Sequence, residues 1–93
     1  MAAKAEISWK RRDAETGERR EVYAQHIGNQ WKFFQREKRF EQWQPLAQPP
    51  LEDWLELLDA VRRRISRRLI RPEEELRLTN AIHERFPEAD IPA

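Results

Sequence analysis

Side chains able to act as catalysts are few in this sequence, and they are scattered. The candidate nucleophiles are Ser8, Thr16, Tyr23, Ser66 and Thr79, and none stands in a motif that supplies an activating base. The absence of cysteine excludes disulfides, thiol catalysis and cysteine-bound metals, and it fits a reducing compartment. The two glycines both fall in expected turns and cannot form a phosphate-binding loop. The sequence therefore predicts a protein that is not an enzyme and needs no cofactor or metal.

The two histidines stand alone in the sequence. His26 is expected on an apolar sheet face opposite Trp31, where a buried and hydrogen-bonded histidine is the ordinary arrangement. His83 is expected at the boundary of a helix. Acidic residues gather at predicted helix starts, where the helix dipole accounts for them without any catalytic role.

A basic and aromatic pattern over residues 6–36 could bind a ligand. If Gly28-Asn29 forms a two-residue turn, Tyr23 lies opposite Phe34, and their face carries several cations with Glu21 as the lone acid. This candidate surface consists of Lys10, Arg12, Arg19, Tyr23, Lys32, Phe34 and Arg36. Rings that stack on bases beside cations that meet phosphates are typical of single-stranded nucleic-acid binding. A solvated sheet face with a cross-strand aromatic pair has the same pattern, so both interpretations stay open.

A second candidate surface lies on an arginine-rich segment, and we name it the arginine ridge. It consists of Arg63, Arg64, Arg67, Arg68 and Arg71. Arginines four residues apart on a helix repel one another by about 0.2–0.5 kcal/mol per pair. A solvated helix face is the ordinary interpretation of such a run. The charge could be neutralised internally by Glu73, Glu74 and Glu75, or externally by an acidic partner, and the sequence does not decide between them.

The first half of the chain must position the basic and aromatic residues, and it reads as strands. Alternation of polar and apolar residues predicts strands over 6–12, 19–27 and 30–36, and leaves open a fourth over 40–43. The register that places Ile7 and Trp9 beside Ala24 and Val22 makes one face almost wholly apolar.

The second half of the chain reads as helices. Prolines over residues 44–50 predict a rigid surface crossover, since this segment cannot sit inside a sheet or helix. Apolar residues spaced by three and four then predict helices over 51–68 and 72–86. The expected apolar stripe of the first helix is Leu51, Trp54, Leu55, Leu58, Val61 and Ile65. That of the second is Leu76, Thr79, Ile82 or His83, and Phe86.

The predicted fold is α+β. It comprises a three- or four-stranded antiparallel meander followed by a two-helix hairpin packed on one sheet face, which shields Trp9, Trp31 and Phe33. Ninety-three residues allow one domain, expected over 6–88, with a disordered start at 1–5 and a tail at 89–93.

Composition limits the classes of protein that fit. Charged residues make up 38% of the chain and the longest apolar run is two residues, so no segment is expected to cross a membrane or direct secretion. We therefore expect a small cytoplasmic, non-catalytic interaction module, a monomer or homodimer, that binds an unknown protein partner through either basic surface. The alternative is a nucleic-acid-binding domain that uses the sheet face.

Overall fold

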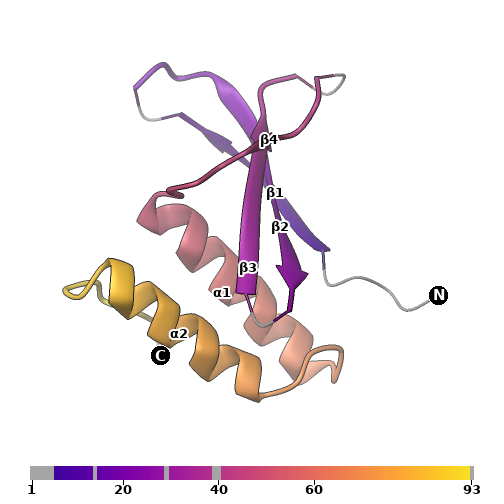
Figure 1. Cartoon of the computed structure of the whole chain (residues 1–93), viewed down its shortest axis with the longest axis vertical. Coiled ribbons are helices and arrows are strands. Elements are labelled where there is room, and N and C mark those ends of the chain that lie inside the picture. Colours follow the sequence, from indigo (N-terminus) through magenta and orange to yellow (C-terminus); the bar gives the residue numbers. More distant parts are fainter. Residues whose placement is uncertain (1–5, 14, 29, 39–40, 93) are drawn as a thin grey trace. The chain divides into compact units, whose positions relative to one another are not determined.

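The structure is a computed structural model that describes residues 6–13, 15–28, 30–38 and 41–92. Four strands precede two helices (Figure 1). The elements are β1 (Glu6–Arg12), β2 (Arg19–Ile27), β3 (Gln30–Arg36), β4 (Gln44–Pro45), α1 (Leu51–Ser66) and α2 (Glu73–Arg85). The predicted α+β arrangement, an antiparallel sheet followed by a helical hairpin, is confirmed. The segment 1–5, expected to be disordered, lies outside the described residues.

The chain divides into two compact units. Residues 1–48 contain the sheet and residues 49–93 contain the helices, with the boundary in the proline-rich crossover. The expectations that both units form one domain, and that the helices cover one sheet face, stay predictions. Each unit is described separately below.

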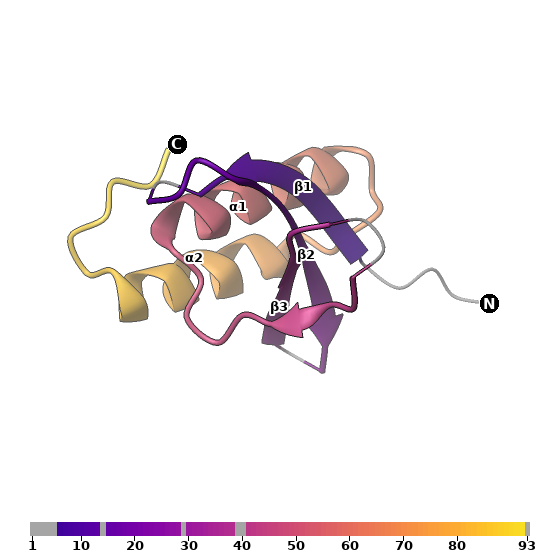
Figure 2. The ribbon, with the colours of Figure 1, turned by 90° about the horizontal axis from the view of Figure 1, so that it is seen from above.

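The sheet has the strand order β1-β2-β3-β4, with each strand antiparallel to the next (Figure 2). His26 lies opposite Trp31 and Tyr23 opposite Phe34, as a two-residue turn requires. Ile7 lies opposite Ala24, which confirms the register chosen for the first hairpin. Gly28 adopts a φ of +61°, a conformation in which glycine avoids the steric penalty of a side chain.

Alternation along the strands separates an apolar face from a basic one. The fully or nearly fully buried members of the apolar face are Ile7, Val22, Ala24 and Phe33. Among the three rings expected to be shielded, Phe33 is buried and Trp9 and Trp31 are half-buried. Trp9 meets Phe33 edge-on, with ring centroids 6.1 Å apart, so the aromatic residues add directional packing to this face.

The fourth strand differs from its prediction. It comprises Gln44–Pro45 rather than residues 40–43, of which Phe40 lies outside the described residues. Pro45 pairs with Phe34, and the next amide, that of Leu46, donates to the Phe33 carbonyl over 2.9 Å. The proline was expected to exclude this segment from the sheet. It is tolerated because β4 is the last strand in the order, where a missing N–H donor faces no further strand.

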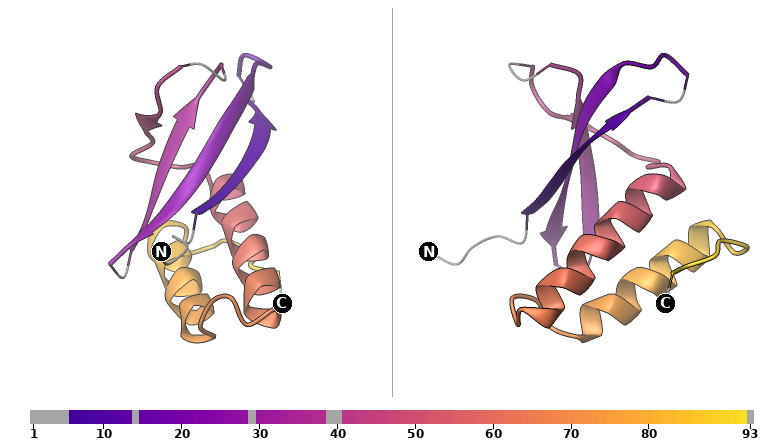
Figure 3. Two further views of the ribbon diagram at one scale, coloured as in Figure 1. Left: turned by 90° about the vertical axis from the view of Figure 1, so that its right-hand side faces the viewer. Right: turned by 180° about the vertical axis from the view of Figure 1, so that it is seen from behind.

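The two helices run antiparallel beside each other, as both views in Figure 3 show. Each is shorter than predicted, because α1 ends at Ser66 and α2 lies between Pro72 and Phe86. The end of α1 is set by Arg68, whose φ of +60° is left-handed. The amide of Leu69 donates to the Arg64 carbonyl, and that of Arg68 to the Ile65 carbonyl. These two hydrogen bonds form a Schellman motif, which stops the helix.

The buried sides of the helices differ in part from the expected stripes. In α1 the buried residues are Asp53, Trp54, Leu57, Leu58, Ala60 and Val61, so Leu57 belongs to the core and Leu55 is half-buried. In α2 the prediction was wrong for Leu76, which is 65% exposed, whereas Leu78 and Ile82 are buried. Leu78 and Ile82 are four residues apart and share one side of the helix, whereas Leu76 lies about 200° from Leu78. An exposed apolar residue near the start of a helix can therefore cause the wrong residues to be assigned to its buried side.

Asp13 organises the turn between β1 and β2. Its Oδ1 accepts hydrogen bonds from the amides of Glu15 at 2.8 Å and Thr16 at 3.3 Å, and its Oδ2 accepts one from Arg20 Nε at 2.9 Å. The two amide donors, followed by the nearby guanidinium, lower the pKa of the Asp13 carboxyl below its usual 3.8.

Replacement of Asp13 tests this turn through its pH dependence. The pKa of Asp13 is lower in the folded state than in the unfolded state. The ionised carboxylate therefore stabilises the fold above pH 3.8, and this stabilisation is lost as the pH falls through the folded-state pKa. We expect Asp13→Ala to lower the melting temperature near pH 7, and this difference from the parent protein to shrink as the pH falls below 3.8. Circular dichroism melts measure both, with the exposed Asp90→Ala as control. A difference between Asp13→Ala and the parent that persists undiminished at low pH would contradict the assignment.

Candidate binding surfaces

The register places all seven residues of the basic sheet surface on one face, opposite the buried one. They come from three neighbouring strands, as predicted. Their side chains nevertheless differ in environment. Lys10, Arg12, Arg19 and Lys32 are exposed, whereas Tyr23, Phe34 and Arg36 are half-buried.

The aromatic rings of this face contact one another. Tyr23 and Phe34 stack with centroids 4.9 Å apart and an interplanar angle of 18°. Trp43 meets Tyr23 edge-on at 4.6 Å, at an angle of 75°. A base that stacked on Tyr23 would therefore compete with both neighbours. The arrangement is a small aromatic cluster that stabilises its own hairpin.

Trp43 is a member of this surface that the sequence analysis did not include. It lies just before β4, and continuing the pairing of Phe34 with Pro45 by two residues brings it level with Arg36. The Arg36 guanidinium sits 4.2 Å from the centre of the Trp43 ring. Correct placement of the fourth strand would have supplied this signal, because an aromatic residue level with a cross-strand arginine favours a cation–π contact.

Arg36 is also neutralised by an acid. Its Nη2 lies 3.1 Å from Glu21 Oε2, with both side chains about one-fifth exposed. Between Glu21 and Trp43, this guanidinium already has two partners. Arg36 therefore contributes more to the structure of the sheet than to an open cationic surface.

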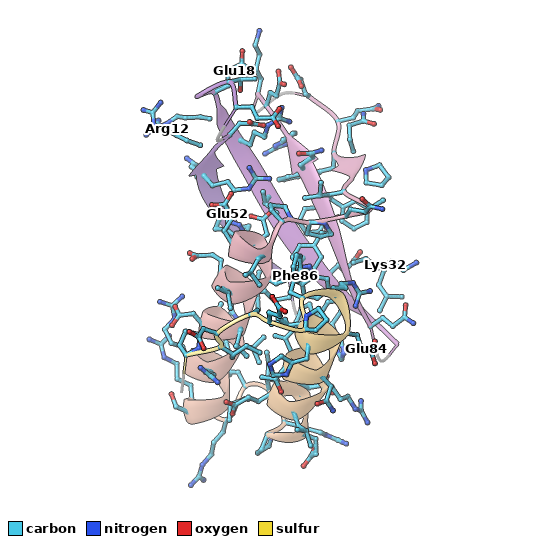
Figure 4. The ribbon with its side chains drawn as sticks, turned by 90° about the vertical axis from the view of Figure 1, so that its left-hand side faces the viewer. Arg12, Glu18, Lys32, Glu52, Glu84 and Phe86 are labelled. Carbon is cyan, nitrogen blue, oxygen red and sulfur yellow. The ribbon has the colours of Figure 1, made fainter. Side chains whose placement is uncertain are left out.

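The other four cations of the basic sheet surface are less constrained. No ion pair to Lys10, Arg12, Arg19 or Lys32 occurs among the residues that the structure describes. Arg12 lies directly opposite Arg19, an arrangement of like charges that is unfavourable unless an anion bridges them. Lys32 is four residues from Arg36 along β3, about 13 Å away. Figure 4 shows Arg12 and Lys32 near opposite ends of the sheet, so the cations do not form one compact patch.

The arginine ridge occupies the last turn of α1 and the segment that follows it. Arg63 and Arg64 belong to the helix, Arg67 is its C-cap residue, and Arg68 and Arg71 lie beyond. Two of the expected repulsive pairs, Arg64 with Arg68 and Arg67 with Arg71, are therefore not helical neighbours, because the chain changes direction at Arg68. The carboxyl end of the helix dipole stabilises Arg63, Arg64 and Arg67.

The ridge is not neutralised by the three glutamates that follow it. Glu75 binds Arg62, with 2.7 Å between Oε2 and Nε, and Glu74 binds Arg77 on its own helix at 3.2 Å. Within the described ranges, Glu73 has no ion pair, and the one acid that reaches the ridge is Asp59, 3.3 Å from Arg63. Both side chains of that pair are about 65% exposed, so it contributes little. Four of the five ridge arginines thus lack an acidic partner in this part of the chain.

A hollow of about 250 Å³ opens beside the ridge. Ala60, Arg63, Arg64 and Arg67 line it, and their spacing places them on one side of α1. The Nε of Arg64 is shielded from solvent and meets no acceptor among the described residues. The hollow is therefore bordered by three arginines, and one of them, Arg64, has an N–H donor without an acceptor among the described residues.

Two further features distinguish this end of the hairpin. Arg68 adopts a left-handed conformation that is unfavourable for a residue with a side chain by about 1–2 kcal/mol. Leu69, the next residue, is 66% exposed. An apolar side chain is thus presented directly beside the cations.

The remaining chemical candidates are not brought together. Ser66 and Thr79 donate their hydroxyls to carbonyls of their own helices, at 2.9 and 3.0 Å. His26 stacks on Trp31 with centroids 4.7 Å apart and is half-buried, while His83 is exposed on α2. No group of three metal-ligating side chains occurs in the described part of the chain.

Comparison with known proteins finds no family model, no curated protein and no solved structure that matches this chain. Neither α1 nor α2, the helices of the described segments, combines the length and apolar character needed to cross a bilayer.

Replacement of Arg68 by glycine tests the strain at the end of α1. Glycine removes the steric penalty of the left-handed conformation, about 1–2 kcal/mol. It also increases the conformational entropy of the unfolded chain, which destabilises the folded state by about 0.4–1 kcal/mol. We expect Arg68→Gly to raise the free energy of unfolding by about 0.5–1 kcal/mol. Urea denaturation measures the change, and Arg68→Ala, which keeps the strain, is the matched control. Equal stability of the two variants would contradict the expected relief.

Proposed function

We propose that this chain is a small non-catalytic interaction module that binds an acidic segment of a partner protein through the arginine ridge. The observation that carries the proposal is that the positive charge of the ridge arginines is not neutralised by nearby acids. The nearby glutamates bind Arg62 and Arg77 instead of the ridge, which leaves four ridge arginines without an acid in the described part of the chain. A complementary anionic surface would remove the resulting repulsion and gain charge-assisted hydrogen bonds.

The conformation of Arg68 supports the same proposal. The helix dipole explains why cations lie near the end of α1, but it does not explain an arginine at a left-handed position where glycine is more favourable. Strained residues of this kind persist where another requirement outweighs stability. The requirement proposed here is a positive charge at the turn.

The exposed leucine favours a protein as the partner. Leu69 follows Arg68 directly and is 66% exposed, so a bound segment would meet an apolar side chain beside the cations. Peptides with acidic and apolar residues fit such a mixed surface, because burial of the leucine adds affinity that charge alone does not supply.

An acidic peptide tests the ridge directly. The probe is a fluorescein-labelled peptide of glutamate and leucine, followed by fluorescence anisotropy, with a lysine–leucine peptide as reference. We expect the double variant Arg67→Gln/Arg71→Gln to weaken binding about fivefold, or about 1 kcal/mol, and added salt to weaken it further. The variant Arg19→Gln/Lys32→Gln removes the same charge from the sheet and should bind as the parent does. Loss of binding in the sheet variant alone would overturn the proposal.

Nucleic-acid binding by the basic sheet surface is the second candidate function. The observation that favours it is the direct opposition of Arg12 and Arg19, which lack an acidic partner in the described segments and could share a phosphate. The contacts among Tyr23, Phe34 and Trp43 argue against stacking of bases on these rings. This candidate therefore requires binding through the phosphate backbone.

An oligonucleotide titration separates the second candidate from the first. For backbone binding, an oligouridine probe at about 50 mM salt should bind weakly, with an affinity that falls steeply as salt rises. Arg12→Gln/Arg19→Gln should then reduce both the affinity and its salt dependence, while Tyr23→Leu should not. Absence of binding at low salt would exclude this candidate and leave the acidic-peptide proposal untouched.

A further inference from the structure

The hollow beside α1 has the chemistry of a site for a doubly charged oxyanion. Its lining residues, Ala60, Arg63, Arg64 and Arg67, follow the spacing of one helix side, so three arginines border it beside the small side chain of alanine. Its volume of about 250 Å³ equals that of several water molecules at about 30 Å³ each. There is room for a phosphoryl group and part of its hydration.

Arg64 contributes a donor that has no acceptor among the described residues. The Nε of this half-buried side chain is shielded from solvent and finds no acceptor among the described residues. A buried donor without an acceptor is unfavourable, and Arg64 differs from Arg36, which has the same feature, in having no acidic partner among the described residues. A change of the Arg64 rotamer that turned this N–H toward the hollow would let an oxyanion there accept it.

The other two guanidinium groups are available to share such a ligand. Arg67 is exposed and has no acidic partner in the described portion of the chain. Arg63 contacts Asp59 at 3.3 Å, but exposure of both side chains makes this pair weak. Reorientation of Arg63 from Asp59 toward a more highly charged anion would therefore require little energy.

The number of donors favours a phosphoryl group over a carboxylate. One guanidinium saturates the two oxygens of a carboxylate through a bidentate pair. A phosphomonoester carries about −1.5 to −2 charge near neutral pH and offers three acceptor oxygens, which match three arginines. On the basis of the function proposed above, we infer that the hollow binds the phosphoryl group of a phosphorylated acidic segment, so that phosphorylation of the partner strengthens its binding to the ridge.

The test uses the full chain and inorganic phosphate as the probe. In ¹H–¹⁵N spectra at constant ionic strength, phosphate should produce saturable shifts at the backbone amides of residues 60–67 and at the Nε–H of Arg64. Chloride at the same ionic strength should not. Absence of saturable shifts, or equal shifts with chloride, overturns the inference.

Conservative variants distinguish a phosphate site from general positive charge. Arg64→Lys keeps the charge but loses the fork of donors, and should weaken phosphate binding about tenfold. Arg67→Lys, at an exposed position where folding is not at risk, should weaken it as well. Arg71→Lys lies outside the hollow and should bind phosphate as the parent does. Equal affinity in the Arg64 and Arg71 variants overturns the inference.

A final comparison separates this inference from the proposed function. The glutamate–leucine peptide is compared with a version that carries one phosphoserine, which should bind at least about tenfold more tightly and depend on Arg64. If both peptides bind equally, the phosphoryl site is wrong and the ridge proposal stands. If neither binds, both fail. Arg64-dependent binding of oligouridine that is tighter than that of the phosphopeptide overturns the assignment to a phosphorylated protein.

Discussion

The left-handed backbone at Arg68 is the constraint on which the chemistry of the helical unit depends. It stops α1 after four turns. The arginines of the ridge, which would otherwise continue along one helix, are thereby divided into a helical group and a group beyond the turn. Arg63 and Arg64 lie in the last turn of the helix and Arg67 caps it, where the helix dipole stabilises them, while Arg68 and Arg71 lie beyond the cap. The hollow exists on the helical side of this division, because its lining needs the regular spacing of an α-helix.

The spacing of the cations distinguishes the two basic surfaces more clearly than ion pairing does, because among the described residues each surface has one paired cation, Arg36 on the sheet and Arg63 on the ridge. On the sheet, Glu21 and Trp43 occupy the central arginine, and Asp13 and Glu37 both bind Arg20. Around the hairpin, the glutamates of α2 bind Arg62 and Arg77, which flank the ridge on either side. Internal pairing thus stabilises the framework of each unit and leaves four cations unpaired on each surface among the described residues, spread along the sheet but gathered at the end of α1 on the ridge.

Sequence reasoning succeeded where one pattern determines many contacts. The alternation of residues about Gly28 fixed every pair between β2 and β3, because a shift of one residue would have moved all apolar side chains to the other face. Sequence reasoning failed where contacts depend on the point at which the backbone turns or a helix ends. The position of β4, the exposure of Leu76 and the end of α1 each depend on a local geometry that residue types do not encode. The left-handed Arg68 that ends α1 could not be predicted either, since an arginine at such a position follows no propensity.

The short β4 has a consequence for how copies of this chain can associate. Sheets from different molecules join through exposed edge strands. A fibre forms only if each copy has two such edges. Here one border consists of two residues, one a proline without an N–H group, whereas the other is the seven-residue β1. On its side of the sheet β4 covers only Phe34 and Gln35 of β3, and its proline offers no N–H to a further strand, so β1 is the better template for pairing with a second copy.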